Sequence, residues 1–377
     1  MRMTQLKTIA DIQTGPFGSQ LHKEDYVETG TPIVTVEHLG NRVFTEQNLP
    51  RVSDSDKARL IKYTLSTGDI VFSRVGSVDR CSYVDKSHDG WMFSGRCLRV
   101  RPTELVDSLY LYYYFCLEET KQFVRNIAVG ATMPSINTKL LGEVEIALPD
   151  LNNQKRIAAV LSSLDDKIEN NQKLNDNLLE QASSIYQAWF EDFILSDGSC
   201  PPSWKQGTLA GIADITSGKR PPVKSAEKTD NAIIPIVGAA SVMGYTTAAN
   251  HTDKILVTGR VGTHGVVQRF NSPCWASDNT LVITSAFYEY TFQILQRIDY
   301  RAMNRGSTQP LITQGDMNKV PILIPDNETL LKFETLVGQL MKQYQVNLLE
   351  NDKLAELREA LLPRLMSGEL DVSDLDI

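Results

Sequence analysis

The sequence predicts an α+β protein, in which two similar globular domains are separated by a long antiparallel two-helix coiled coil with pseudo-two-fold symmetry. Two observations predict this fold. The second half of the chain repeats the first, because four landmark residues recur unchanged 176 positions later: Gly130, Pro134, Val144 and Asp150. Each copy of this block is followed by roughly 40 polar residues with apolar side chains at coiled-coil spacing.

The repeat divides the chain into five segments. These are the first globular domain, the first helix, the second globular domain, the second helix and an acidic tail, at 1–150, 151–195, 196–325, 326–370 and 371–377. Both globular segments follow one plan. Ile9-Ala10-Asp11-Ile12 recurs as Ile212-Ala213-Asp214-Ile215 at an offset of 203, and Arg74-Val75-Gly76 recurs at an offset of 186. The falling offset predicts shorter loops in the second domain.

Each globular segment is expected to be mixed in secondary structure. Short apolar runs such as 33–36 and 69–72 predict strands, and Gly and Pro separate them. Residues 108–124 are rich in aromatic side chains at helical spacing and predict one buried helix. Its aromatic residues are therefore expected in the core and not stacked on nucleic-acid bases.

Each long segment carries a heptad seam. Counting alternately four and three residues from Ile157 leads to Trp189 through mostly apolar positions, and the same count from Phe333 leads to Leu365. Arg358 is the one charged residue in either seam. Its stem is expected to pack while its guanidinium reaches solvent. The acidic pair at 165–166 is expected on a solvated helix face.

Two asparagines stand at the middle of each seam. If the helices pair antiparallel about them, the facing residues include Asn171–Asn351, Asn175–Asn347 and Trp189–Phe333. Paired asparagines cost stability but fix the register, because in a shifted register an asparagine would face an apolar side chain. The alternative is that each helix packs only on its own domain. The matching asparagine layers favour the coiled coil.

Charge is unevenly distributed along the chain, whose formal net charge is −8. Residues 1–150 carry 17 Lys and Arg against 19 Asp and Glu, and residues 194–325 carry 12 against 9. The helical segments are acidic, with 4 against 7 in 151–193 and 5 against 11 in 326–377. The globular domains are thus near neutral, and neither is expected to bind DNA strongly alone, because phosphate neutralisation supplies most non-specific affinity.

Composition and motifs exclude several other classes. Hydrophobic and charged contents of 42% and 22% are those of a soluble globular protein. Membrane-length apolar runs and a secretion-signal core are absent from the sequence, so we expect a cytoplasmic protein without a membrane partner. The five scattered cysteines predict free thiols, and neither cysteines nor histidines have the spacing of a metal site.

Motifs of enzymes are missing as well. The sequence contains neither Asn-Pro-Pro-Tyr nor Asp-Pro-Pro-Tyr, the tetrapeptides of amino-methyltransferases. The glycines around Gly218 lack the spacing and the hydroxyl residue of a phosphate-binding loop, and those around Gly262 do not form GxGxxG. We therefore expect no catalytic residue and no metal or cofactor bound by this chain.

Three stretches resemble a known family. They are Leu148-Pro149-Asp150-Leu151-Asn152-Asn153-Gln154-Lys155-Arg156-Ile157-Ala158, Leu164-Asp165-Asp166-Lys167-Ile168-Glu169-Asn170-Asn171 and Leu361-Leu362-Pro363-Arg364-Leu365-Met366-Ser367-Gly368-Glu369-Leu370. With the duplication, they make essentially the whole chain similar to the DNA-specificity (S) subunit of type I restriction–modification systems. The second copy departs from the family at 327–333, where the Gln-Lys/Arg-Ile signature is degraded.

The resemblance implies a function and partners. Each globular domain would be a target-recognition domain that reads one half of a bipartite double-stranded DNA target, and the helices would set the non-specific spacer between the halves. Two methyltransferase subunits would dock on the helices and carry S-adenosylmethionine. Two restriction subunits, with ATP and Mg, are optional further partners. By itself this chain would be non-catalytic.

Candidate DNA-contacting residues are the polar residues of loops that follow equivalent strands. The Gly-rich loops contribute Thr14, Gly15, Phe17, Ser19, Gln20, Ser217, Lys219 and Arg220. The loops after the Arg-Val-Gly strands contribute Arg74, Ser77, Arg260, Thr263 and His264. The block repeated at 176 contributes Thr132, Arg305, Ser307, Thr308 and Gln309, and Arg96 completes the set.

Alternatives to DNA contact remain at several of these positions. DNA contact is favoured over an ordinary turn for Lys219 and Arg220, whereas a surface salt bridge is an equal alternative for Arg74 and Arg260. The loops of the 176 repeat are equally compatible with framework hairpins. The alternative function is a coiled-coil organiser whose globular ends bind proteins or small ligands. Methylated adenines in a bipartite motif would separate the two.

Overall fold

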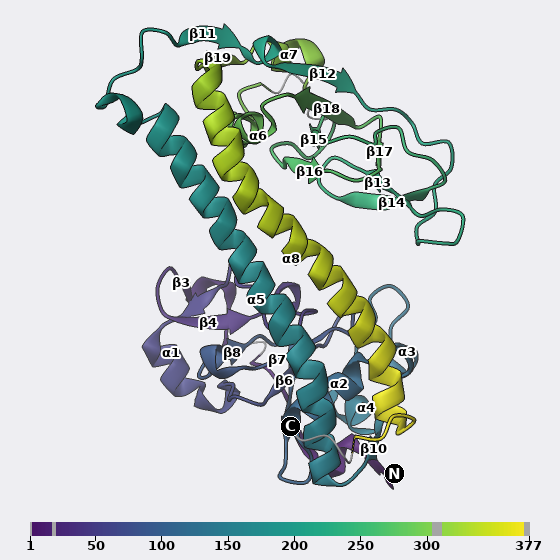
Figure 1. Cartoon of the computed structure of the whole chain (residues 1–377). Coiled ribbons are helices and arrows are strands. Elements are labelled where there is room, and N and C mark those ends of the chain that lie inside the picture. Colours follow the sequence, from purple (N-terminus) through teal and green to yellow (C-terminus); the bar gives the residue numbers. More distant parts are fainter. Residues whose placement is uncertain (1, 17–19, 304–310, 373–377) are drawn as a thin grey trace. The chain divides into compact units, whose positions relative to one another are not determined.

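The chain forms two compact units in a computed structural model, which describes residues 2–16, 20–303 and 311–372 (Figure 1). The first unit comprises 1–171 with 349–377, and the second comprises 172–348. Both long helices, α5 (Leu151–Phe190) and α8 (Asn327–Ser367), contribute residues to both units. Each unit combines strands with helices, which confirms the predicted α+β class with two similar domains.

The first unit is built on a four-stranded antiparallel sheet. Its order is β2 (Ala10–Thr14), β9 (Cys97–Pro102), β6 (Ile70–Ser73) and β7 (Cys81–Tyr83). A second sheet has the order β3 (Tyr26–Val27), β5 (Arg51–Val52), β4 (Thr31–Val34) and β8 (Met92–Phe93), and β4 and β8 run parallel. The remaining elements are β1 (Arg2–Gln5) paired with β10 (Glu145–Leu148), and α1 (Asp54–Arg59), α2 (Ser108–Cys116), α3 (Glu118–Ile127) and α4 (Thr138–Gly142).

The second unit repeats this topology, except that its second sheet has three strands where the first unit has four. Its four-stranded antiparallel sheet has the order β12 (Ala213–Ser217), β18 (Thr280–Ser285), β15 (Ile255–Gly259) and β16 (Gln268–Phe270). The parallel pair recurs as β13 (Ile234–Val237) with β17 (Trp275–Ala276), and β14 (Val242–Thr246) lies beside β13. The pair β1–β10 recurs as β11 (Lys205–Thr208) with β19 (Pro321–Ile324), and the helices are α6 (Tyr288–Arg297) and α7 (Gln314–Asn318). The duplication in sequence is therefore a duplication of strand order.

The aromatic helix lies in the core, as predicted. Residues 110–115 of α2 are all buried, and Tyr110 donates its hydroxyl proton to the Ala147 carbonyl at 2.6 Å. Tyr290 of α6 donates to the Leu323 carbonyl at the same distance. A buried hydroxyl needs such a partner, so these bonds fasten each helix to β10 or β19. The single helix predicted over 108–124 is in fact two, because the backbone is extended at Leu117.

The long helices pair antiparallel within each unit, in the predicted register. In the first unit Asn171 donates from Nδ2 to Asn351 Oδ1 at 2.8 Å. In the second unit Asn347 donates from Nδ2 to Asn175 Oδ1 at 2.9 Å, and the rings of Trp189 and Phe333 lie 5.9 Å apart. Three of the four asparagines are buried. These contacts confirm the facing pairs, because the sequence positions rise along α5 as they fall along α8.

The prediction for Asp165 and Arg358 was wrong. Asp165 is only 4% exposed, although it was expected on a solvated face, and it accepts from Arg358 Nη1 at 2.6 Å. Tyr113 donates its hydroxyl proton to the same carboxylate at 2.7 Å. The packing of α2 against α5 covers this carboxylate. The side chain of Arg358 is 33% exposed, but its guanidinium is paired with that charge instead of being free in solvent. Asp166, beside it, remains largely exposed.

The second unit has no counterpart of this ion pair at the matched positions. A shift of 176 residues takes Asp165 to Met341 and takes Ala182 to Arg358. Met341 and Ala182 are both buried in the apolar core of the second unit. The two halves of the helix pair therefore share an asparagine layer but differ in what lies beyond it.

A partly buried carboxylate covers the start of α6. Glu334 accepts the backbone N–H groups of Glu289 and Tyr290, at 3.1 and 2.9 Å. Donors at a helix N-terminus favour the ionised carboxylate. Burial nevertheless outweighs them and raises the pKa of Glu334 to about 7.

This raised pKa predicts a pH dependence of stability. The pKa of an unfolded glutamate is lower, about 4.3. Folding thus favours the neutral form of Glu334. Its contribution to the free energy of unfolding is complete below about pH 4 and is lost as the pH rises through about 7. Replacing Glu334 by Gln should make the second unit more stable than that of the wild type at pH 8, by roughly 3–4 kcal/mol, and leave the two alike at pH 4. Denaturant unfolding at both pH values tests this, and a difference that does not grow with pH contradicts it.

Candidate nucleic-acid interface

The candidate loops gather at one end of the four-stranded sheet in each unit. In the first unit, β2 and β6 end where their antiparallel neighbour β9 begins. In the second unit, β12 and β15 likewise end where β18 begins. Antiparallel neighbours bring such ends together, so loops far apart in sequence become adjacent. We call them the sheet-end loops.

A glycine in each unit lets the first of these loops approach its neighbour closely. Gly15 donates its N–H to the Cys97 carbonyl at 3.2 Å, and a Cβ atom on it would lie 2.1 Å from the Ser94 carbonyl oxygen. Gly218 donates to the Thr280 carbonyl at 3.0 Å, and its Cβ would lie 2.0 Å from the Ser277 oxygen. No side chain fits at such distances. Gly15 and Gly218 are therefore required for packing and are not DNA contacts through a side chain.

The loop partners of these glycines are two β-turns. Cys97 donates its N–H to the Ser94 carbonyl at 2.9 Å, and Thr280 donates to the Ser277 carbonyl at 3.0 Å. Each bond closes a four-residue turn. The turns are 94–97, between β8 and β9, and 277–280, between β17 and β18. They occupy matched places in the two units.

The two arginines of the repeated Arg-Val-Gly motif bond to these turns through their backbone. Arg74 and Arg260 donate their N–H to the carbonyls of Arg96 and Asn279, both at 2.8 Å. Arg74 also donates from Nη1 to the Gly95 carbonyl at 3.1 Å. The side chain of Arg74 thus braces its turn, and neither a DNA contact nor a salt bridge describes this role fully.

The loop repeated at 176 lies beside the Arg-Val-Gly turn in the first unit. Gly76 donates its N–H to the Pro134 carbonyl, and Ile136 donates to the Arg74 carbonyl, both at 2.9 Å. Thr132 is exposed at the tip of this hairpin. In the second unit Ile312 makes the equivalent bond to the Arg260 carbonyl at 3.0 Å. The candidates Arg305, Ser307, Thr308 and Gln309 lie outside the described residues.

The Gly-rich loops differ in what they present. Lys219 and Arg220 are exposed, while the backbone of Lys219 is held by its own N–H to the Ala276 carbonyl and by Trp275 Nε1 donating to its carbonyl, at 2.9 and 2.7 Å. Burial, and then the charge of Lys219, lower the pKa of His251. Two cations on a fixed backbone suit phosphate contact. Ser217 and Thr14 are half-buried at the ends of their strands.

Other candidates are engaged within the protein or face solvent. The side chain of Gln20 accepts from the Tyr63 hydroxyl at 2.6 Å, which gives it a structural partner. His264 Nδ1 lies 3.2 Å from the Gly259 carbonyl oxygen, inside its turn. Ser77, Arg96 and Thr263 are exposed. Phe17 and Ser19 lie outside the described residues.

Sequence reasoning missed Asn279, which is exposed at the third position of the second turn. Its counterpart is Arg96, 183 residues earlier. Between the turns Ser94-Gly95-Arg96-Cys97 and Ser277-Asp278-Asn279-Thr280 only the serine is shared, so the repeat is not visible in the letters alone. Matched backbone bonds were needed to find it.

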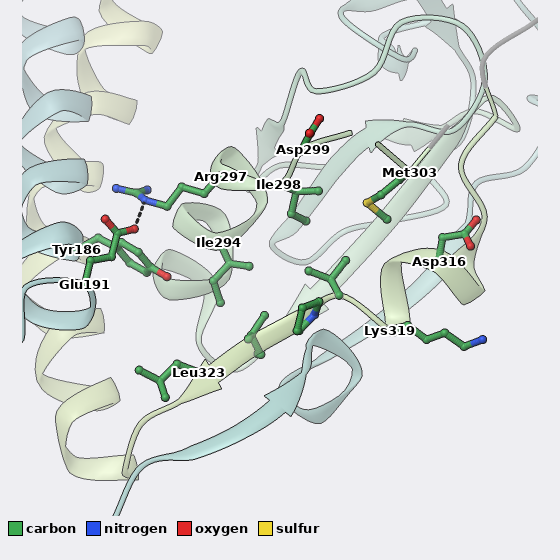
Figure 2. Close-up of a pocket in the computed structure, with 13 residues that line it drawn as sticks. Tyr186, Glu191, Ile294, Arg297, Ile298, Asp299, Met303, Asp316, Lys319 and Leu323 are labelled. Carbon is green, nitrogen blue, oxygen red and sulfur yellow. Dashed lines mark hydrogen bonds and ion pairs between the residues drawn. The ribbon is translucent and has the colours of Figure 1, made fainter. Parts of the chain in front are cut away.

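A second kind of feature, an open groove, lies away from the sheet-end loops. In the second unit a groove of about 480 Å³ lies between the end of α5, α6 and β19 (Figure 2). Arg297 crosses it, donating from Nε to Glu191 at 2.9 Å and lying over the ring of Tyr186, 4.2 Å from its centre. Apolar side chains such as Ile294 and Leu323 line it together with charged ones, which are Glu191, Arg297, Asp299, Asp316 and Lys319.

The first unit holds a matching groove of about 870 Å³ at the end of α8, beside α2, α3 and β10. The two grooves share equivalent lining positions, which are Tyr186 and Leu362, Glu191 and Ser367, Ile294 and Tyr114, Arg297 and Leu117, Ile298 and Glu118, Asp299 and Glu119, and Leu323 and Ala147. Leu117 stands in place of Arg297, and Ser367 in place of Glu191, so the first groove lacks the Arg297–Glu191 ion pair at these positions. Both grooves carry more acidic than basic residues.

Within residues 2–16, 20–303 and 311–372, no group of three His, Cys, Asp or Glu side chains is placed to hold a metal ion. Over the same ranges, every helix is too short or too polar to span a membrane.

Comparison with known proteins shows which family the chain resembles. The model of the type I restriction modification DNA specificity domain matches residues 1–180 and 201–359. The chain is 28% identical over 312 residues to the type I restriction enzyme MjaIX specificity subunit of Methanocaldococcus jannaschii, covering 73% of this chain and 72% of that protein. It is 21% identical over 404 residues to the HindI specificity subunit of Haemophilus influenzae, covering 82% and 88%.

A solved structure shares the fold. The crystal structure of the type I restriction–modification S subunit from M. genitalium superposes with a TM-score of 0.61 at 18% identity, covering 97% of this chain and 95% of that one. The family model matches twice and takes in most of the chain, in line with the duplicated topology. The chain belongs to the type I restriction–modification DNA specificity family.

Proposed function

We propose that this chain reads a bipartite double-stranded DNA target, one half-site with each unit, on behalf of a type I restriction–modification complex. The observation that carries the proposal is the duplicated set of sheet-end loops. In both units a glycine, a β-turn and an arginine backbone are joined by the same bonds, while the exposed side chains differ. A shared framework with different tips suits two half-sites of different sequence.

Partner subunits supply what the chain lacks in this proposal. The globular segments are near neutral, so tight binding to DNA needs further phosphate contacts from elsewhere. We assign these contacts, the adenine methylation and the S-adenosylmethionine to two methyltransferase subunits. ATP and Mg belong to restriction subunits where these are present. The chain itself acts as the non-catalytic specificity subunit.

The matched grooves support two docking sites for the methyltransferase subunit. One groove lies in each unit, and each is formed by the end of a long helix with equivalent neighbours. Apolar lining residues, with more acidic than basic ones among them, fit an amphipathic segment that carries basic side chains. Two similar sites within one chain predict two copies of one partner.

Selection of DNA by the assembled complex tests the proposed function. The chain is co-expressed with its methyltransferase subunit, the complex is purified, and bound sequences are recovered from a random duplex pool. We expect two defined half-sites at a constant separation. A chain that does not co-purify with the methyltransferase, or a complex that enriches no sequence, would instead favour a coiled-coil organiser that binds proteins or small ligands.

The exposed pair Lys219 and Arg220 should act as phosphate contacts. Each phosphate contact contributes about 0.9 to the slope of log affinity against log salt. Lys219→Ala with Arg220→Ala should therefore weaken binding and flatten this slope by about 1.8 without changing the preferred bases. Lys205→Ala with Lys332→Ala removes the same charge from exposed positions outside the loops and serves as control. An unchanged slope in the first variant removes the pair from the interface.

Charge reversal at one groove should remove one partner copy. Glu119 and Glu359 are exposed residues of the first groove, so Glu119→Lys with Glu359→Lys alters its charge with little effect on the core. Repulsion of a basic partner segment should leave complexes with one methyltransferase subunit where wild type has two. Native mass spectrometry counts the copies, with Glu104→Lys as an exposed control outside the groove. Two retained copies would exclude this groove as a docking site.

A further inference from the structure

We infer that the β-turns 94–97 and 277–280 are the base-reading elements of the two units, with Arg96 reading a guanine and Asn279 reading an adenine. This inference rests on the proposed function and names the residues that would carry it. The two turns are matched in their backbone hydrogen bonds but differ in the side chains at their tips.

Each turn is braced by the same backbone bonds. Ser94 and Ser277 donate their N–H to the carbonyls of Val34 and Val237, at 2.9 and 3.1 Å. Their closing residues accept from Gly15 and Gly218, and their third residues accept from Arg74 and Arg260. A turn tied to three neighbouring segments has little freedom. Side chains at its tip are therefore displayed from a rigid base, which precise recognition needs.

The tips are the part that differs. Arg96 and Asn279 occupy the third position of their turns, and both are exposed. Their backbone carbonyls are bonded, but among the described residues neither side chain has a hydrogen-bond or ion-pair partner. A positioned polar side chain without an internal partner is available to an external one. Arg74, by contrast, uses its Nη1 atom to hold the first turn.

The two residue types match base chemistry in the major groove. Arginine donates two hydrogen bonds to O6 and N7 of guanine, and asparagine pairs with N6 and N7 of adenine. A phosphate contact is sequence-independent and favours a cation in both units. Arg96 and the uncharged Asn279 are different side chains on the same scaffold. Two units that read different bases require such a difference, whereas a phosphate contact common to both units does not.

Substitution of the two side chains tests the inference in the complete complex. The chain is purified with its methyltransferase subunit, and base preference is measured at every position of both half-sites by binding selection. Arg96→Ala should lower the preference for guanine at one position of one half-site by about 5- to 150-fold, and leave the other half-site unchanged. Asn279→Ala should do the same for adenine in the other half-site. Asn279→Arg should convert that adenine preference into one for guanine.

Two readouts separate this inference from its alternatives. A uniform loss of affinity over all sequences, with a flatter salt dependence, would show that Arg96 contacts phosphate and would overturn the assignment. Unchanged preferences in all three variants would overturn it as well. Thermal unfolding of each variant checks that the turn is intact. Arg96→Lys keeps the charge but loses the planar guanidinium fork, so this variant should also lose the guanine preference. If the wild-type complex selects no bipartite site, the proposed function fails first.

Discussion

Replacing Arg358 by Ala should destabilise the first unit by about 3–5 kcal/mol, among the largest effects expected of a single substitution in this chain. The substitution leaves the carboxylate of Asp165 buried without its charge partner, 4% exposed to solvent. Burial also raises the pKa of Tyr113, whose hydroxyl therefore stays protonated and continues to donate to that carboxylate. One neutral donor does not replace the lost cation.

Replacing Asp165, Arg358 and Tyr113 together should lower the stability of the first unit far less than replacing Arg358 alone. The triple variant Asp165→Met, Arg358→Ala and Tyr113→Phe introduces at two of these positions the residues that the second unit uses, Met341 and Ala182. Apolar replacement of a buried ion pair is often neutral or stabilising, and the phenylalanine leaves no hydroxyl unpaired. Urea unfolding of the three proteins measures both effects. If the single variant is within about 1 kcal/mol of wild type, the ion pair contributes little and this interpretation is wrong.

Replacing Gly218 by Ala should abolish recognition of one half-site and spare the other. The new Cβ would stand 2.0 Å from the backbone oxygen of Ser277, which cannot move aside as a flexible side-chain end could. Separating the two loops breaks the brace of the turn that carries Asn279. The expected loss of stability in the second unit is about 1–3 kcal/mol, and loss of base discrimination follows in that half-site. Gly15→Ala should have the mirror effect in the other half-site.

Gly338 provides the matched control. It lies inside α8, and a Cβ atom there would have nothing within 4 Å. Gly338→Ala should leave both half-sites intact and stabilise the helix by up to about 1 kcal/mol. Binding selection with the three variants measures discrimination one half-site at a time. Equal losses in both half-sites for Gly218→Ala would contradict the assignment of one half-site to each unit.

The helix pairing could be predicted from the sequence because its signals are local and are repeated. A seam of period 3.5 with two central asparagines in each copy leaves one antiparallel register in which Asn171 meets Asn351 and Asn175 meets Asn347. Asp165 was misplaced by the same reasoning. A heptad count finds the helix–helix seam, but α2 covers a neighbouring face of α5, and that contact depends on the fold of the whole unit.

The sheet-end loops were predictable only in part. Equivalent strands implied that loops after Thr14 and after Ser73 would be matched in the two domains, and strand pairing brings these loops together. The turn at Asn279 gave no signal, because it shares one residue with its counterpart and its match lies in backbone hydrogen bonds. Arg74 was recognised as important, yet its bond to the Gly95 carbonyl could not be read from its position in the chain.

Mapping methylated adenines in cells that express this chain with its methyltransferase subunit tests the central claim most directly. If each unit reads one half-site, the map will show a single motif of two defined parts separated by a constant number of undefined bases. The Gly218→Ala variant will lose the definition of one part while the other part stays the same. A single uninterrupted motif, or an unmethylated genome in cells where the complex is assembled, would contradict the account.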